Sequence, residues 1–152
     1  MSMTIEPYID ADYPEVWALH LKTIAENDGF AKNLSFHSDF QNIPKIYDAF
    51  FVLRVDDVLA GMVAFKPDGE IKRLQVASAC QGRGYGHMLM ERVIDHAKAR
   101  GMKRVHLDVS APNRAAFALY LKMGFVITRT DRIEYGPDHE AFDMTFMELA
   151  IS

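Results

Sequence analysis

Apolar residues recur along this chain with two different periods, and together they predict a domain that mixes strands and helices. Short β-rich apolar runs, separated by turn residues, predict strands at 4–9, 49–55, 58–65, 70–76, 104–109, 125–130 and 143–149. Apolar residues repeated every three or four positions predict helices at 13–27, 86–100 and 113–123. The segment 30–47 has no clear period and is expected to hold a further, irregular helix.

Several details sharpen this expectation. The first helix should bury its apolar residues at helical spacing. These are Trp17, Leu21 and Ile24, with Val16 and Leu19 beside them. Strict alternation along strand 70–76 places on one face Glu70, Lys72, Leu74 and Val76. Gly61 marks a bulge in its strand, and the loop between the last two strands is expected to be long enough to form a rim.

These elements predict one mixed α/β domain over residues 1–152, with about seven mostly antiparallel strands flanked by about four helices. The longest apolar run, 58–65, has eight residues, whereas a membrane-spanning helix needs about 20. The first residues lack the basic and apolar pattern of a secretory signal, and the chain has a single cysteine, Cys80. The expected location is the cytoplasm, without a membrane partner.

Charge is distributed unevenly along the chain. The formal net charge is −4, which argues against nucleic acid as a partner. Residues 72–122 hold ten Lys and Arg against three Asp and Glu, so this stretch carries +7 and the remainder carries −11. One half would therefore suit a polyanionic ligand and the other a cationic one, or the charges are simply scattered over solvated faces.

A glycine-rich turn, from Gln81 to His87, lies between a predicted strand and a predicted helix. Glycines let the backbone approach a ligand closely, and the helix start offers unpaired N–H groups, so the segment suits a phosphate or pyrophosphate. The dinucleotide fingerprint fails because His87 and Leu89 stand where a glycine is needed, and the Walker pattern fails at His87. The alternative is a glycine-rich turn without a ligand.

Two sequence blocks resemble the GNAT superfamily of N-acetyltransferases. The first, Gln81-Gly82-Arg83-Gly84-Tyr85-Gly86, resembles the family pattern Q/R-x-x-G-x-G/A between a strand and a helix. The second, residues 113–125, resembles the pattern N-x-x-A-x-x-L-Y-x-x-x-G-F. This resemblance implies a GNAT-like fold in which the central strands splay apart, here between 70–76 and 104–109.

The resemblance also implies acetyl-CoA as the co-substrate. Backbone groups of Leu74 and Val76 would pair with the pantetheine arm, and the Val76 N–H would polarise the thioester carbonyl. The glycine turn would wrap the pyrophosphate, Asn113 would bind the coenzyme arm, and Tyr120 would lie near the sulfur. The implied coenzyme-binding residues are Leu74, Val76, Gln81, Gly82, Arg83, Gly84, Tyr85, Gly86, His87, Asn113 and Tyr120.

Acetyl transfer to an amine needs a proton donor for the leaving thiolate and a base for the amine. The resemblance implies Tyr120 as the general acid, and the alternative is a core tyrosine. Glu70 is the candidate base, acting directly or through a water, and the alternative is a solvated acid at a strand end. Asp108 and Glu148 are weaker candidates. Cys80 is interpreted as structural, and the histidine spacing indicates no metal site.

The expected activity is transfer of an acetyl group from acetyl-CoA to a primary amine of a small molecule or peptide, by direct attack in a ternary complex. The acceptor pocket is expected from the segments 30–47 and 135–140. Their aromatic and acidic residues are Asp28, Phe30, Phe36, Asp39, Phe40, Tyr47, Asp48, Tyr135, Asp138 and Glu140. The alternative function is a non-catalytic acyl-CoA-binding regulatory module. A homodimer is possible on the same resemblance.

Overall fold

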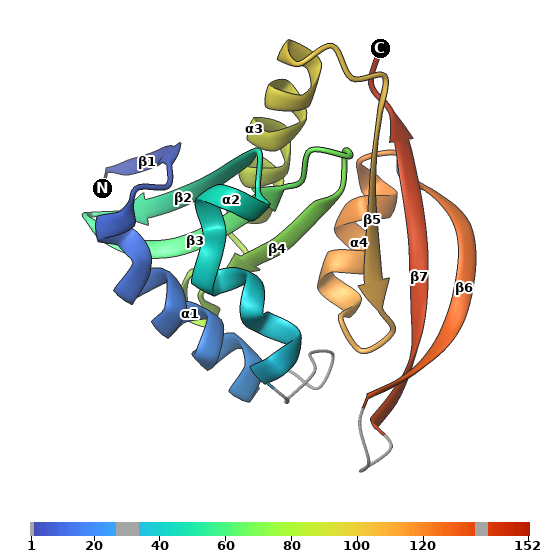
Figure 1. Ribbon diagram of the computed structural model, residues 1–152, viewed down its shortest axis with the longest axis horizontal. Helices are drawn as coiled ribbons and strands as arrows, with labels where there is room; N and C mark the ends of the chain where they lie inside the picture. Colours follow the sequence, from blue (N-terminus) through green and yellow to red (C-terminus); the bar gives the residue numbers. More distant parts are fainter. Residues whose placement is uncertain (1, 27–33, 136–139) are drawn as a thin grey trace.

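The computed structural model describes residues 2–26, 34–135 and 140–152, together with all side chains of these ranges except those of 34–36, 135 and 140. The first sheet is antiparallel with strand order β1-β2-β3-β4, formed by β1 (Met3–Pro7), β2 (Ala49–Val55), β3 (Val58–Phe65) and β4 (Ile71–Val76). The second sheet has the order β5-β7-β6, formed by β5 (Arg104–Ser110), β6 (Val126–Tyr135) and β7 (Glu140–Ala150). Figure 1 shows the two sheets side by side.

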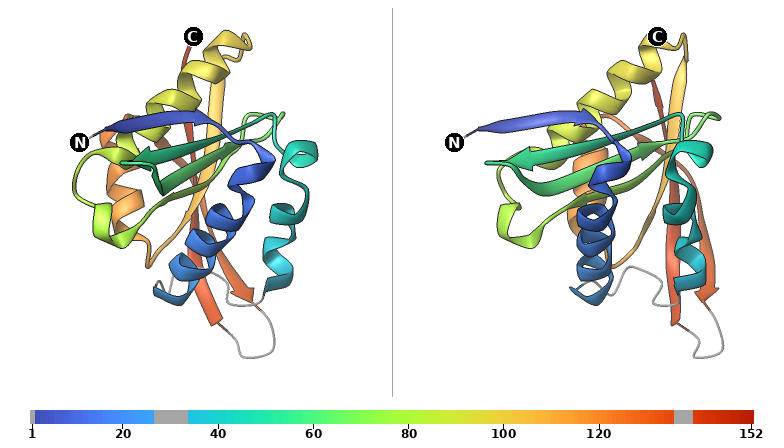
Figure 2. Two further views of the ribbon diagram at one scale, coloured as in Figure 1. Left: turned by 90° about the vertical axis from the view of Figure 1, so that its left-hand side faces the viewer. Right: turned by 60° about the vertical axis from the view of Figure 1, so that its left-hand side comes forward.

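Helices cover both faces of the first sheet. In the described part of the chain the α-helices are α1 (Tyr13–Glu26), α2 (Ile43–Ile46), α3 (Tyr85–Ala99) and α4 (Arg114–Lys122). Three 3₁₀ segments accompany them: η1 (Asp10–Asp12), η2 (Leu34–Asn42) and η3 (Ser78–Cys80). Figure 2 shows α1, η2 and α2 on one face of the first sheet and α3 on the other. The predicted mixed α/β class is confirmed.

Two apolar clusters stabilise this arrangement, one on each face of the first sheet. Along β3, Val63 and Phe65 pack with α3, whereas Met62 and Ala64 pack with α1 and η2. The predicted bulge is present, because Leu53 pairs with Gly61 while Arg54 pairs with Leu59, leaving Ala60 as the extra residue. A Cβ at Gly61 would lie 3.0 Å from Leu89 Cδ1 and 3.1 Å from the Gln75 carbonyl oxygen, so this close approach requires glycine.

A second bulge, in β4, overturns the predicted alternation of that strand. Ala64 pairs with Lys72 and Met62 pairs with Gln75, so two residues of β4 face the single Val63. One of the two is Arg73, whose φ of 59° lies in the left-handed region. Cross-strand partners share a face, so Lys72 and Gln75 face α1. The side chains of Leu74 and Val76 pack instead with the α3 cluster.

The sheet splits between β4 and β5. Among the described residues an isolated bridge, Glu70 with His106, joins the two strands where β4 begins, and the His106 N–H donates to the Gly69 carbonyl oxygen at 3.1 Å. Beyond this bridge β4 and β5 diverge and belong to separate sheets, as Figure 1 shows. The predicted location of the splay is therefore confirmed.

Two other expectations are wrong in detail. In α1 the buried residues are Val16, Leu19, His20 and Ile24, whereas Leu21 is 39% exposed. Val16, Leu19 and Ile24 are therefore buried as predicted, whereas Leu21 is not and His20 was not predicted. The last two strands are longer than predicted, since β6 reaches Tyr135 and β7 begins at Glu140, so much of the expected rim is strand. No helix of the described ranges is both long enough and apolar enough to cross a membrane.

Candidate functional site

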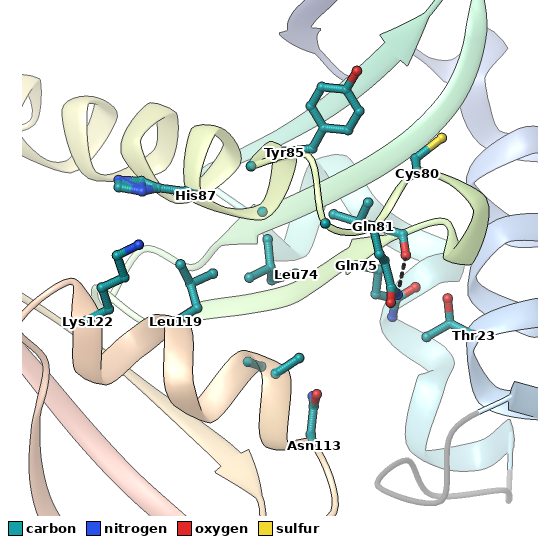
Figure 3. Close-up of a pocket in the computed structure, with 16 residues that line it drawn as sticks. Thr23, Leu74, Gln75, Cys80, Gln81, Tyr85, His87, Asn113, Leu119 and Lys122 are labelled. Atoms are coloured by element: carbon teal, nitrogen blue, oxygen red, sulfur yellow. Dashed lines mark hydrogen bonds between the residues drawn. The ribbon is translucent and has the colours of Figure 1, made fainter.

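A cavity of about 400 Å³ lies where β4 leaves the first sheet. Its wall combines the end of β4, the glycine turn, the first turn of α3 and one face of α4, and Thr23 of α1 also contributes (Figure 3). The lining residues are Thr23, Leu74, Gln75, Val76, Cys80, Gln81, Gly82, Gly84, Tyr85, Gly86, His87, Asn113, Ala115, Ala116, Leu119 and Lys122. Most of the residues implied by the two sequence blocks therefore lie around one cavity.

The glycine turn keeps an open main-chain surface beside this cavity. Gly82 and Gly84 have φ values of 78° and 81°, and a Cβ added to either would meet no atom within 4 Å. These glycines are thus needed for the backbone conformation and not for packing. Gly84 is the N-cap of α3 and no side chain caps the helix, whose first bond runs from the Met88 N–H to the Gly84 carbonyl oxygen at 3.1 Å. The preceding N–H groups of the first turn are available to an anion such as a phosphate.

The edge of β4 presents main-chain groups toward the split. The Ala77 N–H donates to the Ala60 carbonyl oxygen of β3 at 2.7 Å. Main-chain groups alternate in direction along a strand, so those of Val76 and Leu74 turn away from β3 and toward the gap. Gln81 Nε2 donates to the Val76 carbonyl oxygen at 3.1 Å across this edge (Figure 3). An extended ligand fits such an edge as an added strand.

Helix α4 closes the cavity from the other side. Asn113 is its N-cap residue, but its side chain makes no capping hydrogen bond. Its side chain lies at the cavity instead. Lys122, at the last turn of α4, lies near His87 at the opposite end of the view from Gln75 and Thr23 (Figure 3). The cavity therefore has a basic end and a neutral polar end.

Tyr120, the predicted general acid, does not line the cavity. It is 6% exposed, belongs to the apolar cluster under α3, and its ring centroid lies 5.8 Å from that of Phe125. Burial, with a smaller contribution from Asp108, raises the pKa of the Tyr120 hydroxyl well above its usual value. Like any tyrosine the hydroxyl is protonated at neutral pH, and its raised pKa makes it a weaker acid than an exposed tyrosine.

Glu70, the predicted base, lies far from the cavity. It precedes β4, and its carboxylate lies 3.8 Å from Lys66 Nζ. Six residues separate it from Val76, which corresponds to roughly 15–20 Å along a bulged strand. Arg83 is exposed and does not line the cavity either. Asp108 is exposed, and Glu148 pairs with Arg104 at 3.7 Å.

A buried polar network behind β4 was not predicted from the sequence. Gln75 Nε2 lies 2.9 Å from His20 Nδ1, and both side chains are buried. Arg73 binds the Asp39 carboxylate at 2.7 and 3.0 Å and lies 3.1 Å from His37 Nδ1. The network joins α1 and η2 to the β4 bulge. Only His20 could have been singled out from the sequence, because it is a polar residue among the apolar positions of α1.

Burial and the charge of Arg73 set the pKa values of the titratable groups in this network. Burial, reinforced by the nearby charge of Arg73, lowers the pKa of His20 to about 3, so this imidazole is neutral at physiological pH. Burial alone would raise the pKa of Asp39, but the hydrogen bonds and charge of Arg73 outweigh it and the pKa is lowered. Tyr47 donates to the Asp39 carboxylate as well. The network thus contains a stable ion pair beside a neutral imidazole.

The predicted acceptor residues divide into three groups. Asp39 and Tyr47 belong to the network, and Phe40 packs in the core of the same face. Asp48 lies elsewhere, 2.8 Å from His96 Nε2 and 3.1 Å from Arg100 NH2, so it is not part of this cavity. Outside the described residues and side chains are Asp28, Phe30, Phe36, Tyr135, Asp138 and Glu140. Across the described ranges no three His, Cys, Asp or Glu side chains gather as metal ligands would.

Known proteins share this architecture. Residues 11–125 match the acetyltransferase (GNAT) family. An IAA acetyltransferase from Azospirillum brasilense is 33% identical over 104 residues, which are 65% of this chain and 65% of that relative. The chain therefore spans slightly less than two thirds of the length of that curated relative.

Two solved structures resemble the chain over nearly its whole length. The ribosomal-protein-S18-alanine N-acetyltransferase from Escherichia coli is 26% identical, with a TM-score of 0.77 over 99% of this chain and 95% of that one. The yncA protein from Salmonella typhimurium, solved with its cofactor acetyl-CoA, is 19% identical, with a TM-score of 0.82 over 100% of this chain and 95% of that one. At that lower identity the likeness shows the fold alone.

The split sheet, with a glycine turn opening α3 beside the split, belongs to a fold that the chain shares with these two structures. Together with the match over residues 11–125, this shows that the chain belongs to the acetyltransferase (GNAT) family, as the two sequence blocks predicted.

Proposed function

We propose that this chain transfers an acetyl group from acetyl-CoA to a primary amine of a small molecule or peptide. The observation that carries the proposal is the open glycine turn at the start of α3, which lies directly beside the main-chain edge of β4. The turn suits a diphosphate and the edge suits an extended arm, so one ligand that contains both fits the cavity. The family match supports acetyl-CoA as that ligand.

In this proposal each part of the donor has its own partner on the chain. The N–H groups of the glycine turn bind the pyrophosphate, and Lys122 supplies positive charge at that end. The main chain of Leu74 and Val76 pairs with the pantetheine arm, and the Asn113 side chain, which is not used for capping, binds the same arm. The N–H of Val76 polarises the thioester carbonyl. An oxyanion donor of this kind contributes about 3 kcal/mol to transition-state stabilisation.

The reaction requires an amine nitrogen to form a bond to the carbonyl carbon while the carbon–sulfur bond breaks. The leaving thiolate takes a proton. We assign this proton to the hydroxyl of Tyr120 because of its place in the second sequence block, although its side chain does not line the cavity. The amine loses a proton to solvent. Glu70 lies too far along β4 for direct contact, so in our proposal it acts only through intervening water.

The acceptor is proposed only as a chemical class. One relative is named for IAA and one structural neighbour for the alanine of a ribosomal protein, so acceptors in this family differ in size and kind. The neutral, polar end of the cavity near Thr23 and Gln75 suits an amino group that arrives without a large charge of its own. A cytoplasmic location and a homodimer remain predictions from the sequence.

The competing function is a non-catalytic module that binds acyl-CoA and regulates a partner. Calorimetry with acetyl-CoA tests the donor, and release of free thiol tests catalysis. We expect saturable binding, and thiol release with at least one amine of a panel containing n-butylamine, putrescine, glycinamide and a pentapeptide with a free N-terminal alanine. Binding without thiol release for any amine would favour the regulatory module. Absence of binding to folded protein would contradict both functions.

A further inference from the structure

Gln75 is one of the residues that line the cavity, and its side chain carries a buried atom without a hydrogen-bond partner, as does the neighbouring His20 at Nε2. Gln75 is 3% exposed, and its Nε2 donates to Nδ1 of His20, which is 0% exposed. Its Oε1 is buried and has no hydrogen-bond partner among the described residues. Leaving a buried amide oxygen unpaired is costly, and most such oxygens in folded proteins have a partner. Because Gln75 lines the cavity, a donor group on a ligand is a candidate partner for this oxygen.

Gln75 lies between the two residues of β4 that we propose bind the donor, Leu74 and Val76. Leu74 and Val76, on either side of it, turn their side chains toward the α3 cluster, whereas Gln75 faces α1 because of the bulge at Arg73. The cavity is lined by all three residues and by Thr23 of α1, so it reaches the α1 side of β4 as well as the donor side. Figure 3 shows Gln75 and Thr23 at the end away from Lys122 and His87.

We propose that Gln75 binds the attacking amino group, with Oε1 accepting a hydrogen bond from an N–H of the acceptor. This inference rests on the proposed acetyltransferase function and makes Gln75 a substrate-binding residue of that site. One N–H held by Oε1 fixes the orientation of the nitrogen, so its lone pair is directed at the thioester beside Val76. The acceptor is thus a primary or secondary amine that keeps an N–H for this bond.

A carboxamide suits this task better than a carboxylate. The attacking amine must be neutral, and a carboxylate at this position would favour the ammonium form and raise the pKa of the bound amine. The amide oxygen accepts the N–H without adding a charge. His20 acts as a positioning residue, because its ring stacks on Phe40 with centroids 4.1 Å apart and binds Nε2, which leaves Oε1 directed elsewhere.

The test uses two variants of Gln75 with the amine of the panel that gives the fastest thiol release. For Gln75→Leu we expect KM for the amine to rise about 10-fold, with KM for acetyl-CoA changed less than 2-fold. For Gln75→Glu we expect the pH profile of kcat to move about one unit toward alkaline pH, because the new carboxylate stabilises the ammonium form of the amine.

Gln81→Leu is the matched control, since it makes the same change at another glutamine of the same cavity. It should raise KM for acetyl-CoA and leave KM for the amine within 2-fold. A purely structural role for Gln75 predicts equal effects of Gln75→Leu on both KM values and no shift of the pH profile in Gln75→Glu, and either result would overturn the inference. If wild-type protein binds acetyl-CoA but acetylates no amine, the proposed function itself fails, and the inference fails with it.

Discussion

The two ends of the cavity are built in different ways. The end where we place acetyl-CoA, called the donor end, consists largely of main-chain groups. They belong to the glycine turn at Gly82–Gly86, the first turn of α3 and the edge of β4. The end near α1 consists of side chains that hold one another, with Gln75 on His20 and Arg73 on Asp39. Main-chain groups are positioned by the fold and a few glycines, whereas a side-chain network depends on every partner.

The largest expected effect concerns the side-chain end. Asp39→Asn removes the carboxylate from Arg73, whose side chain is only 11% exposed, so we expect the free energy of unfolding to fall by about 3 kcal/mol in urea denaturation. Asp143→Asn is the control, because that carboxylate pairs with Arg132 at the surface and its loss should cost less than about 1 kcal/mol. If both variants lost equal stability, the network would not be the buried support that we describe.

The next effect concerns chemistry at the donor end. Tyr120→Phe removes the hydroxyl and keeps the ring, so we expect kcat to fall about 100-fold, equivalent to about 2.7 kcal/mol. The affinity for acetyl-CoA, measured by calorimetry, should stay within about 2-fold. An unchanged kcat would remove Tyr120 from the proposed mechanism and leave it as a core residue.

The donor end should also depend on backbone conformation. Gly84→Val places a branched side chain at a φ of 81° beside the cavity, so we expect the Kd for acetyl-CoA to rise about 30-fold. Gly101 is a close match for a control, since its φ is 78° and a Cβ there would also meet nothing within 4 Å, but it ends α3 instead of beginning it. Gly101→Val should lose comparable stability and keep the affinity for acetyl-CoA. Equal losses of affinity would show that the effect is not local to the turn.

The smallest effect concerns His20 and pH. Burial lowers the pKa of His20 from 6.5 to about 3 in the folded protein. Between these two pH values, His20 is therefore protonated in the unfolded chain and neutral in the folded protein. Stability from this residue is therefore complete above pH 6.5 and declines as the pH falls. We expect His20 to account for a loss of about 1 kcal/mol between pH 6.5 and 5.5. In His20→Phe, denaturation curves at these two pH values should differ by correspondingly less, and an unchanged difference would contradict the assignment.

Features set by local sequence could be predicted, whereas features set by contacts between distant segments could not. The strands, α3, α4, the glycine turn and the location of the split followed from local periodicity, turn residues and two family blocks. The bulge at Arg73 did not, because it depends on how β4 pairs with Val63 of another strand. Gln75 was missed for the same reason, since only the bulge places it on the α1 side. Asp39 and Arg73 are 34 residues apart, and no local pattern indicates that they pair.

The divergence of β4 from β5 links the stability of the fold to ligand binding. A metabolite that occupies this break can do so only when the chain is folded, because the break does not exist in the unfolded polypeptide. At a free concentration 100 times its Kd such a metabolite adds about 2.7 kcal/mol to stability. An incomplete sheet thereby makes the midpoint of unfolding depend on the concentration of the ligand that fills the break.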